Sequence, residues 1–246
     1  MTIEEQRRIV EEQFAIDYNC TVEDFQNADT IVTLKTNNAE ARKFEQDSPL
    51  SILSYRGKLV ITASEELLPW CQEVLKKHLS AEWCMDAGSL IRIDKKLNEF
   101  NCEIDQAHLF FLPKYDQEDS RYEIHMMSKE EIAELEDDER IDEAFLYEDY
   151  IEDVLGAKIV DEHNQILAVA GATNNSNRMW EMGVNSFVDG KGYGQSTILA
   201  LKNEILKLGK VPFYGTAMSH LASQSVAMKA GMTVGFTELR SVRRER

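Results

Sequence analysis

The chain has little positive charge, few cysteines and no long apolar run, and each shortage excludes a class of protein. Its 27 lysine and arginine residues stand against 44 aspartate and glutamate residues, which gives a formal net charge of −17. Such a charge repels nucleic acids and anionic membranes, whereas neutral or cationic partners are tolerated. No apolar run approaches the roughly 20 residues that cross a bilayer, and the N-terminus lacks the apolar core of a signal peptide. We therefore expect a soluble, cytoplasmic protein.

The sequence also lacks the spacings of disulfide frameworks and metal sites. Its four cysteines, Cys20, Cys71, Cys84 and Cys102, form no Cys-x-x-Cys pair and have no histidine at ligand spacing. The five histidines are scattered along the chain. We expect reduced thiols and no bound metal.

The length of 246 residues is compatible with two domains. A polar, charged connector at 113–120 is the best boundary, so we expect an N-terminal α/β domain of unknown role at 1–117 and a second domain at 118–246. In the first domain the apolar periodicity predicts helices at 2–14, 65–79 and 90–100 and strands at 30–34, 59–63 and 107–112. In the second it predicts strands at 122–127, 155–160, 166–171, 179–184, 211–214 and 233–239 and helices at 196–208 and 221–229.

A glycine-rich stretch follows the strand expected at 179–184. It reads Gly190-Lys191-Gly192-Tyr193-Gly194-Gln195-Ser196 and opens a helix that we expect to start near Gln195. Glycines allow positive φ and leave backbone N–H groups uncovered, and the unpaired amides and dipole of a helix N-terminus attract anions. The stretch therefore predicts a site for a phosphorylated cofactor.

Two common phosphate motifs do not fit this stretch. A P-loop has Lys-Ser or Lys-Thr after its last glycine, where this chain has Gln195-Ser196. A dinucleotide fingerprint places a third glycine where Thr197 stands and an acidic residue about 20 positions later, where residues 211–217 contain none. ATP, GTP and NAD are disfavoured as ligands.

The order of elements and two motifs resemble the GNAT (GCN5-related) N-acetyltransferase family. The pyrophosphate loop of that family reads Arg/Gln-x-x-Gly-x-Gly/Ala between a strand and a helix, and Gly192 and Gly194 match its two small positions. The stretch 219–232 resembles the family's Asn-x-x-Ser/Ala and Lys-x-Gly-Phe signature. The resemblance covers roughly residues 121–240 and is strongest for bacterial members with an extra N-terminal α/β domain. It implies an α/β fold with a mixed central sheet flanked by helices, and acetyl-CoA as cosubstrate.

The resemblance also implies which residues form the site. In the family, two adjacent parallel strands splay apart and their backbone amides hold the acyl and pantetheine arm; here these would be residues 182–185 and 213–217. The cofactor-binding residues so predicted are Gly183, Val184, Asn185, Gly190, Lys191, Gly192, Tyr193, Gly194, Gln195, Ser196, His220 and Ser223. Glu181 would take the proton of the attacking amine, and Tyr214 and His220 are candidates to protonate the leaving thiolate.

Three positions depart from the family pattern. Asp189 stands where Arg or Gln is usual, so that Lys191 is left as the nearby cation, and His220 stands where Asn is usual. Ala227 stands where many members have the tyrosine thought to protonate the thiolate. The resemblance therefore leaves two functions open. One is an N-acetyltransferase that acts on the amine of a small molecule or peptide, and the other is a non-catalytic CoA-binding sensor or scaffold with a degenerate GNAT site. Both are compatible with a homodimer.

A densely acidic segment runs from Glu130 to Asp153 and contains Arg140 as its one basic residue. At its start, Ser128 and Glu131 fit a capping box. The segment is interpreted either as the solvated face of a helix or as an amine-attracting rim of the acceptor groove, the place that family members give to this region. The second interpretation predicts a cationic acceptor.

Overall fold

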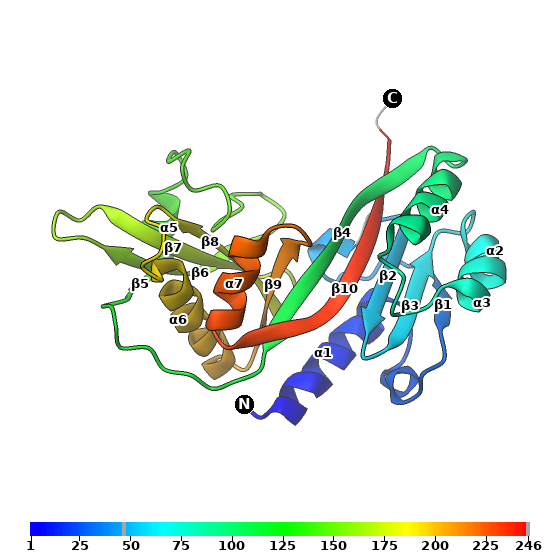
Figure 1. The fold of residues 1–246 in the computed structure, drawn as a ribbon, viewed down its shortest axis with the longest axis horizontal. Helices are drawn as coiled ribbons and strands as arrows, with labels where there is room; N and C mark the ends of the chain where they lie inside the picture. The colour runs from blue at the N-terminus through cyan, green and yellow to red at the C-terminus, as the bar shows by residue number, and fades with distance from the viewer. Residues whose placement is uncertain (46–47, 245–246) are drawn as a thin grey trace. The chain divides into compact units, whose positions relative to one another are not determined.

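The computed structural model describes residues 1–45 and 48–244, and contacts divide the chain into two compact units. The C-terminal unit contains residues 1–9 and 111–233, and the N-terminal unit contains residues 10–110 and 234–246 (Figure 1). The domain boundary at 117/118 stays a prediction. It would leave residues 234–246 with the second domain, whereas contacts assign them to the N-terminal unit.

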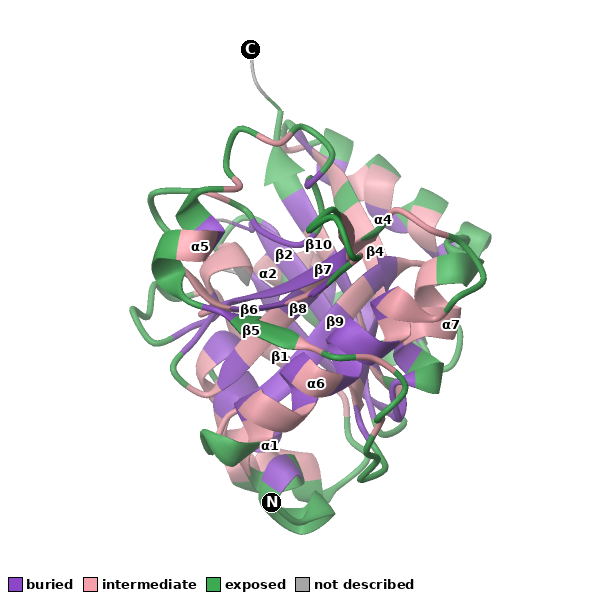
Figure 2. Cartoon of the chain, turned by 90° about the vertical axis from the view of Figure 1, so that its left-hand side faces the viewer, coloured by how far each residue is buried: buried purple, intermediate pink, exposed green. Residues whose placement is uncertain are grey.

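The C-terminal unit is built on strands in the order β9-β8-β7-β6-β5. The strands are β5 (His125–Met127), β6 (Asp153–Val160), β7 (Ile166–Thr173), β8 (Met179–Ser186) and β9 (Val211–Ala217). Neighbours are antiparallel except β8 and β9, which are parallel and are connected by α6. The helices of this unit are α5 (Lys129–Ala133), α6 (Tyr193–Lys207) and α7 (Leu221–Lys229). α6 packs against β6, β7 and β8, and β7 is buried over most of its length (Figure 2).

The predicted mixed α/β class is confirmed, as are the strands and helices expected between residues 155 and 229. The capping box at Ser128 and Glu131 is present. The interpretation of residues 130–153 as one helical face is wrong beyond Ala133, because the following residues form turns, bends and irregular segments. Like charges three and four residues apart destabilise a helix, and the amides of this segment instead bond to the side chains of Asn185 and Asp153.

The N-terminal unit contains a second set of strands, in the order β1-β3-β2-β10-β4. They are β1 (Ile31–Leu34), β2 (Leu50–Tyr55), β3 (Lys58–Ala63), β4 (Cys102–Pro113) and β10 (Met232–Arg243). Its helical elements are most of α1 (Ile3–Asp17), the turns η1 (Val22–Gln26) and η2 (Lys43–Glu45), the run of α2 (Leu68–Trp70), the π-helical η3 (Cys71–Leu75) and α3 (Lys76–His78), and α4 (Ala87–Asn98). Among the described residues, no helix is long and apolar enough to cross a membrane.

β2 is absent from the sequence-based prediction although its turn carries a recognisable signal. Tyr55 pairs with Lys58, and the two residues between them, Arg56 and Gly57, have φ of +52° and +77°. Two consecutive residues with positive φ form the turn type that matches the twist of a hairpin. Gly57 supplies that conformation without strain, so Arg56-Gly57 after an apolar run indicates the hairpin of β2 and β3.

A buried ion cluster lies in the core of the N-terminal unit. Arg42 Nε is 2.6 Å from Asp17 Oδ2, and Arg42 Nη2 is 2.8 Å from Glu238 Oε1. The Tyr18 hydroxyl donates to the same Glu238 oxygen at 2.6 Å. All four residues are buried. One guanidinium thus contacts two carboxylates away from water, and its removal would take its positive charge from both.

Replacing Arg42 is therefore expected to destabilise the protein strongly. Arg42→Ala should lower the free energy of unfolding by roughly 3–5 kcal/mol, the usual cost of breaking a buried ion pair. Arg243→Ala is the matched control, since Arg243 Nη2 is 2.8 Å from Glu66 Oε1 but both side chains are exposed. The control should lose no more than about 1 kcal/mol. Urea unfolding measures both, and equal losses in the two variants would contradict the role given to the cluster.

Candidate functional site

The glycine turn, residues 190–194, leads into α6 as the sequence predicts. Gly190 and Gly192 have φ of +73° and +81°, and Gly192 is the N-cap of the helix, which begins at Tyr193. The Ser196 amide donates to the Gly192 carbonyl at 3.0 Å, the first bond of the helix. Within the described chain, the amides of residues 193–195 have no hydrogen-bond acceptor. These three N–H groups lie at the positive end of the helix dipole, where an anion is stabilised.

The two strands beside this turn separate after a short paired stretch. β8 and β9 pair from Met179 with Val211 to Glu181 with Phe213. Beyond these pairs, β8 continues to Ser186 and β9 to Ala217 without further pairing between them in the described residues. The backbone groups that face the other strand over residues 182–186 and 214–217 are thus open for another partner. The opening, which we call the strand gap, overlaps the residues predicted to splay apart, except that Phe213 is still paired.

Glu181 lies at the last paired position of β8, at the entrance to the strand gap. Its side chain is half-buried, and Asn175 Nδ2 donates to Glu181 Oε2 at 2.9 Å. Asn175 is itself buried, so this contact fixes the direction of the carboxylate. The carboxylate of the predicted base is therefore held at the gap by a buried asparagine.

Tyr214 is the first residue of β9 beyond the paired stretch. It is buried, and its hydroxyl is 2.8 Å from Ser223 Oγ on α7. Burial raises the pKa of Tyr214, the hydrogen bond to Ser223 lowers it in part, and the negative charge of Glu143 raises it. The phenol is held protonated near neutral pH, as a proton donor must be.

His220 is the N-cap of α7 and is exposed, and its side chain makes no capping bond. Ala227, in the place of the usual tyrosine, is fully buried within α7. The structure thus brings Tyr214 and Ser223 together and leaves His220 at the surface. The roles of Glu181, Tyr214 and His220 in catalysis stay predictions.

The predicted cofactor residues differ in how far their side chains are already engaged. Lys191 is exposed, and Val184 and Tyr193 are half-buried. Gln195 Nε2 donates to the Lys229 carbonyl at 3.1 Å. Ser196 is buried, and its hydroxyl donates to Asp119 Oδ2 at 2.5 Å. The Ser196 hydroxyl therefore already hydrogen-bonds to another residue of the protein.

A row of glycines shapes the opposite side of the site. Gly156, Gly171 and Gly183 are directly paired across β6, β7 and β8. A β-carbon built on Gly171 would lie 2.0 Å from the Ala144 carbonyl oxygen, and one on Gly183 would lie 1.7 Å from the Glu143 carbonyl oxygen. The acidic segment therefore lies directly on the sheet, at a distance that only glycine permits.

Asn185 fastens the acidic segment beside this row. Its Oδ1 accepts the amides of Glu143 and Ala144 at 3.0 and 2.8 Å, and its Nδ2 donates to Asp142 Oδ1 at 2.7 Å. Asn185, predicted as a cofactor residue, thus uses its side chain to position the segment that carries Glu143. A contribution of its backbone to cofactor binding stays a prediction.

Arg121 is a residue of the site that motif analysis misses. It belongs to a segment, residues 114–122, that we call the strap. Arg121 Nη2 is 3.2 Å from Ser196 Oγ, and the Tyr122 hydroxyl donates to the Lys191 carbonyl at 2.6 Å. The sequence contains no signal for this contact, because Arg121 lies 75 positions before Ser196.

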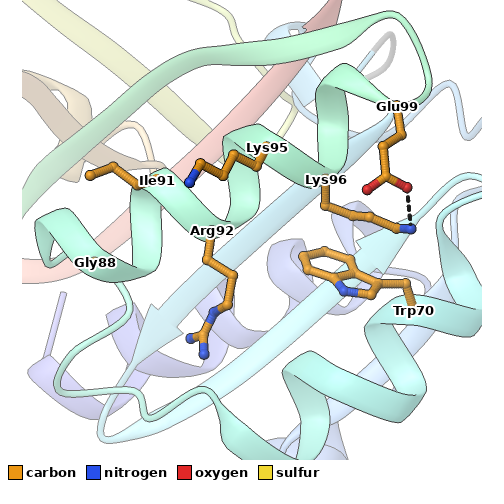
Figure 3. Close-up of a pocket in the computed structure, with 7 residues that line it drawn as sticks. All are labelled: Trp70, Gly88, Ile91, Arg92, Lys95, Lys96 and Glu99. Carbon is orange, nitrogen blue, oxygen red and sulfur yellow. Dashed lines mark hydrogen bonds and ion pairs between the residues drawn. The ribbon is translucent and has the colours of Figure 1, made fainter.

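The cavity in Figure 3 belongs to the N-terminal unit. It has a volume of about 510 Å³ and is lined by Trp70, Gly88, Ile91, Arg92, Lys95, Lys96 and Glu99. Lys96 Nζ is 2.6 Å from Glu99 Oε2, and Arg92 and Lys95 point away from each other (Figure 3). Its cations do not converge on one point, and none of its lining residues belongs to the glycine turn or the strand gap.

Solved structures that resemble the chain include members of the GNAT family, whereas no family model and no curated protein sequence match it. A GCN5-related N-acetyltransferase-like protein from Streptococcus suis is 15% identical over 98% of this chain and 99% of that chain, with a TM-score of 0.46. A GCN5-related N-acetyltransferase from Kribbella flavida is 13% identical over 81% and 88%, with a TM-score of 0.46. An acetyltransferase of the GNAT family from Colwellia psychrerythraea is 12% identical over 58% and 57%, with a TM-score of 0.40.

The close packing on the glycine row generates a stability prediction. Gly171→Ala forces the backbone of the acidic segment away from the sheet and should lower the free energy of unfolding by about 1–3 kcal/mol, as overpacking does. Gly88→Ala is the control, because the nearest atom to its added β-carbon lies at 3.6 Å and alanine favours the helix. Urea unfolding of both variants tests this prediction. An unchanged unfolding midpoint for Gly171→Ala would show that the acidic segment does not pack this closely on the sheet.

Proposed function

We propose that the chain is an N-acetyltransferase that transfers an acetyl group from acetyl-CoA to an amine by direct attack. One observation carries the proposal: the gap between two parallel strands opens beside a helix N-terminus with three unused amides. The amides offer a place for the diphosphate, and the strand edges offer hydrogen bonds to the amide groups of the pantetheine arm. The glycine motif and its resemblance to GNAT sequences agree with this arrangement.

The shape of the turn fits a phosphate group. Gly190 and Gly192 supply the positive φ that turns the chain without covering the amides. A β-carbon on Gly194 would meet Ser186 Cβ at 3.3 Å, so the helix start packs closely on β8. Thr216 Oγ1, on the part of β9 that does not pair with β8, is buried without a hydrogen-bond partner among the described residues. That hydroxyl is a further group that a ligand in the gap would satisfy.

Glu181 and Tyr214 are assigned the two proton transfers. The amine nitrogen forms a bond to the thioester carbonyl carbon, Glu181 takes the amine proton directly or through water, and the C–S bond breaks. Tyr214 gives its proton to the sulfur and regains one through Ser223 or water. Glu181 pairs with Phe213, and Tyr214 is the next residue of β9 beyond that pair. A thiolate with a pKa of about 8.5 needs little acid assistance, so the base is the more important group.

The acceptor is assigned as a cationic amine because of the acidic segment. Glu143 is exposed, its backbone lies on Gly183 of β8, and its charge acts on the Tyr214 hydroxyl. The net charge of the chain acts in the same direction over longer distances. A carboxylate at the gap attracts an ammonium group, which loses one proton to water before attack, and Glu181 then takes the second proton during attack. This assignment covers small molecules and peptide amines alike.

The alternative function, a CoA-binding sensor or scaffold without catalysis, is favoured by Ala227 and Asp189. It shares the glycine turn and the strand gap with the enzyme and differs in the chemistry at Glu181 and Tyr214. Release of free thiol from acetyl-CoA over a panel of amines separates the two functions. Turnover with any amine supports the enzyme, and CoA binding without turnover across the panel supports the sensor.

For the enzyme, Glu181→Gln should retain CoA binding and lower kcat by roughly a hundredfold or more, since it removes the base and keeps the shape. Glu152→Gln is the control, because Glu152 lies outside the strand gap and also accepts from an asparagine, Asn174 Nδ2 at 3.3 Å, besides its ion pair with Lys129. Thiol release with a saturating acceptor measures kcat. A Glu181→Gln variant as active as the control would remove Glu181 from the mechanism.

The acceptor assignment predicts a selective effect of Glu143→Gln. The KM of a cationic amine should rise several-fold, because the attraction between Glu143 and the amine is lost. The salt dependence of this KM should weaken, because salt screens that attraction in the wild type over a Debye length of about 8 Å at physiological ionic strength. The KM of acetyl-CoA and of a neutral amine should change little. Glu139→Gln, an exposed acid of the same segment, is the control. If the KM of a cationic acceptor changes neither with Glu143→Gln nor with salt, the acidic segment does not attract the acceptor.

A further inference from the structure

We propose that Arg121 of the strap binds the diphosphate of CoA and so replaces the cation that the glycine turn lacks. The inference rests on the proposed function, and it assigns a specific ligand contact to a residue outside the motif. Asp189 and Lys191 flank Gly190 and are both exposed, so the charges of the turn's own side chains cancel. An additional cation beside the three backbone amides would strengthen the binding of a diphosphate.

Arg121 lies directly over the turn. Its Nη1 atom is 3.2 Å from the point where a β-carbon of Gly192 would lie, and its Nη2 atom is 3.2 Å from Ser196 Oγ. The guanidinium therefore covers the glycine face at the N-cap of α6 and reaches the first turn of the helix. An anion bound by the amides of residues 193–195 would lie within reach of the same group.

The guanidinium is oriented by Asp119 and keeps one nitrogen free. Arg121 Nε donates to Asp119 Oδ1 at 2.9 Å, and Nη2 donates to Oδ2 at 2.7 Å. Nη1 has no hydrogen-bond partner among the described residues. Hydrogen bonds from Arg121 and from Ser196 hold the pKa of Asp119 far below its usual range, so the orienting charge persists at any physiological pH. A fixed arginine fork with a free N–H edge is well suited to a phosphate oxygen.

Exposure separates the roles of the two residues. The Asp119 side chain is 9% exposed, whereas the Arg121 side chain is 48% exposed. Asp119 is thus enclosed by the protein and acts as a positioning residue. Arg121 stays open to a ligand through its Nη1 group, which Asp119 does not occupy.

The strap is fastened to the unit at several points, so Arg121 is positioned before any ligand arrives. Lys202 Nζ, which is buried in α6, donates to the Tyr115 carbonyl at 3.0 Å. Asn203 Nδ2 donates to the Gln117 carbonyl at 2.9 Å. Near the turn, the Tyr122 ring lies 4.7 Å from that of Tyr193. A side chain held in place loses little conformational freedom on binding, which favours affinity.

The chain provides a matched control for this arginine. Arg140 and Asp138 have the same spacing and the same geometry, with Arg140 Nε 2.8 Å from Asp138 Oδ1 and Nη2 2.6 Å from Oδ2. Arg140 lies on the acidic segment, with its guanidinium 5.0 Å from the centre of the Phe187 ring. Replacing Arg140 removes an equivalent Asp–Arg pair and an equal charge without touching the glycine turn.

Titration calorimetry of the full chain with CoA, and with pantetheine as a probe that lacks the diphosphate, tests the inference. Arg121→Ala should weaken CoA binding roughly 10- to 100-fold, as the loss of a charge-assisted contact does, and should leave pantetheine binding unchanged. Arg121→Lys should fall between wild type and Arg121→Ala, because it keeps the charge and loses the fork. Arg140→Ala should bind CoA like wild type.

Four results bear directly on the inference. Equal CoA affinity for Arg121→Ala and Arg140→Ala, or equal losses for CoA and pantetheine in Arg121→Ala, would overturn it while leaving the proposed function intact. If Arg121→Lys retains full CoA affinity and Arg121→Ala loses most of it, the positive charge of residue 121 matters and the fork-shaped contact does not, which would overturn that part of the inference. Failure of the wild-type chain to bind CoA at all would overturn the proposed function, and this inference with it.

Discussion

The site depends on the point at which β8 and β9 stop pairing. After three residue pairs β8 and β9 no longer pair with each other. Their facing edges therefore have backbone groups without hydrogen bonds between the two strands, inside a region of the sheet that is otherwise paired. Unpaired backbone groups are costly when buried, so such an opening is retained where something else binds to it. Everything assigned to the site lies around it: Glu181 at the last pair, Tyr214 just beyond, and the start of α6 beside it.

The two sides of the opening are formed by different parts of the C-terminal unit and carry different charge. On the α6 side, the glycine turn, its amides and Arg121 provide donors and positive charge for an anion. On the glycine-row side, the acidic segment lies on Gly171 and Gly183 and presents Glu143. This division suits a reaction in which an anionic donor and a cationic acceptor approach from opposite directions and meet between the strands.

The sequence is informative where local chemistry determines the structure. Gly192 and Gly194 indicate the turn because positive φ and close packing demand glycine, and Ser128 with Glu131 indicates a cap because both bonds are local. The role of Asn185 is not predictable in this way. It depends on contacts between the acidic segment and a strand more than forty residues away. Arg121 is hidden for the same reason, since it reaches the turn only when the strap folds over α6.

A crystal structure of the chain with bound CoA is the most direct test of the central claim, that the strand gap and the α6 N-terminus form a single CoA site. The account predicts diphosphate oxygens within hydrogen-bond distance of the amides of residues 193–195, and the pantetheine arm between β8 and β9 beyond Glu181 and Phe213. CoA bound elsewhere, or β8 and β9 paired along their whole length with CoA present, would contradict it.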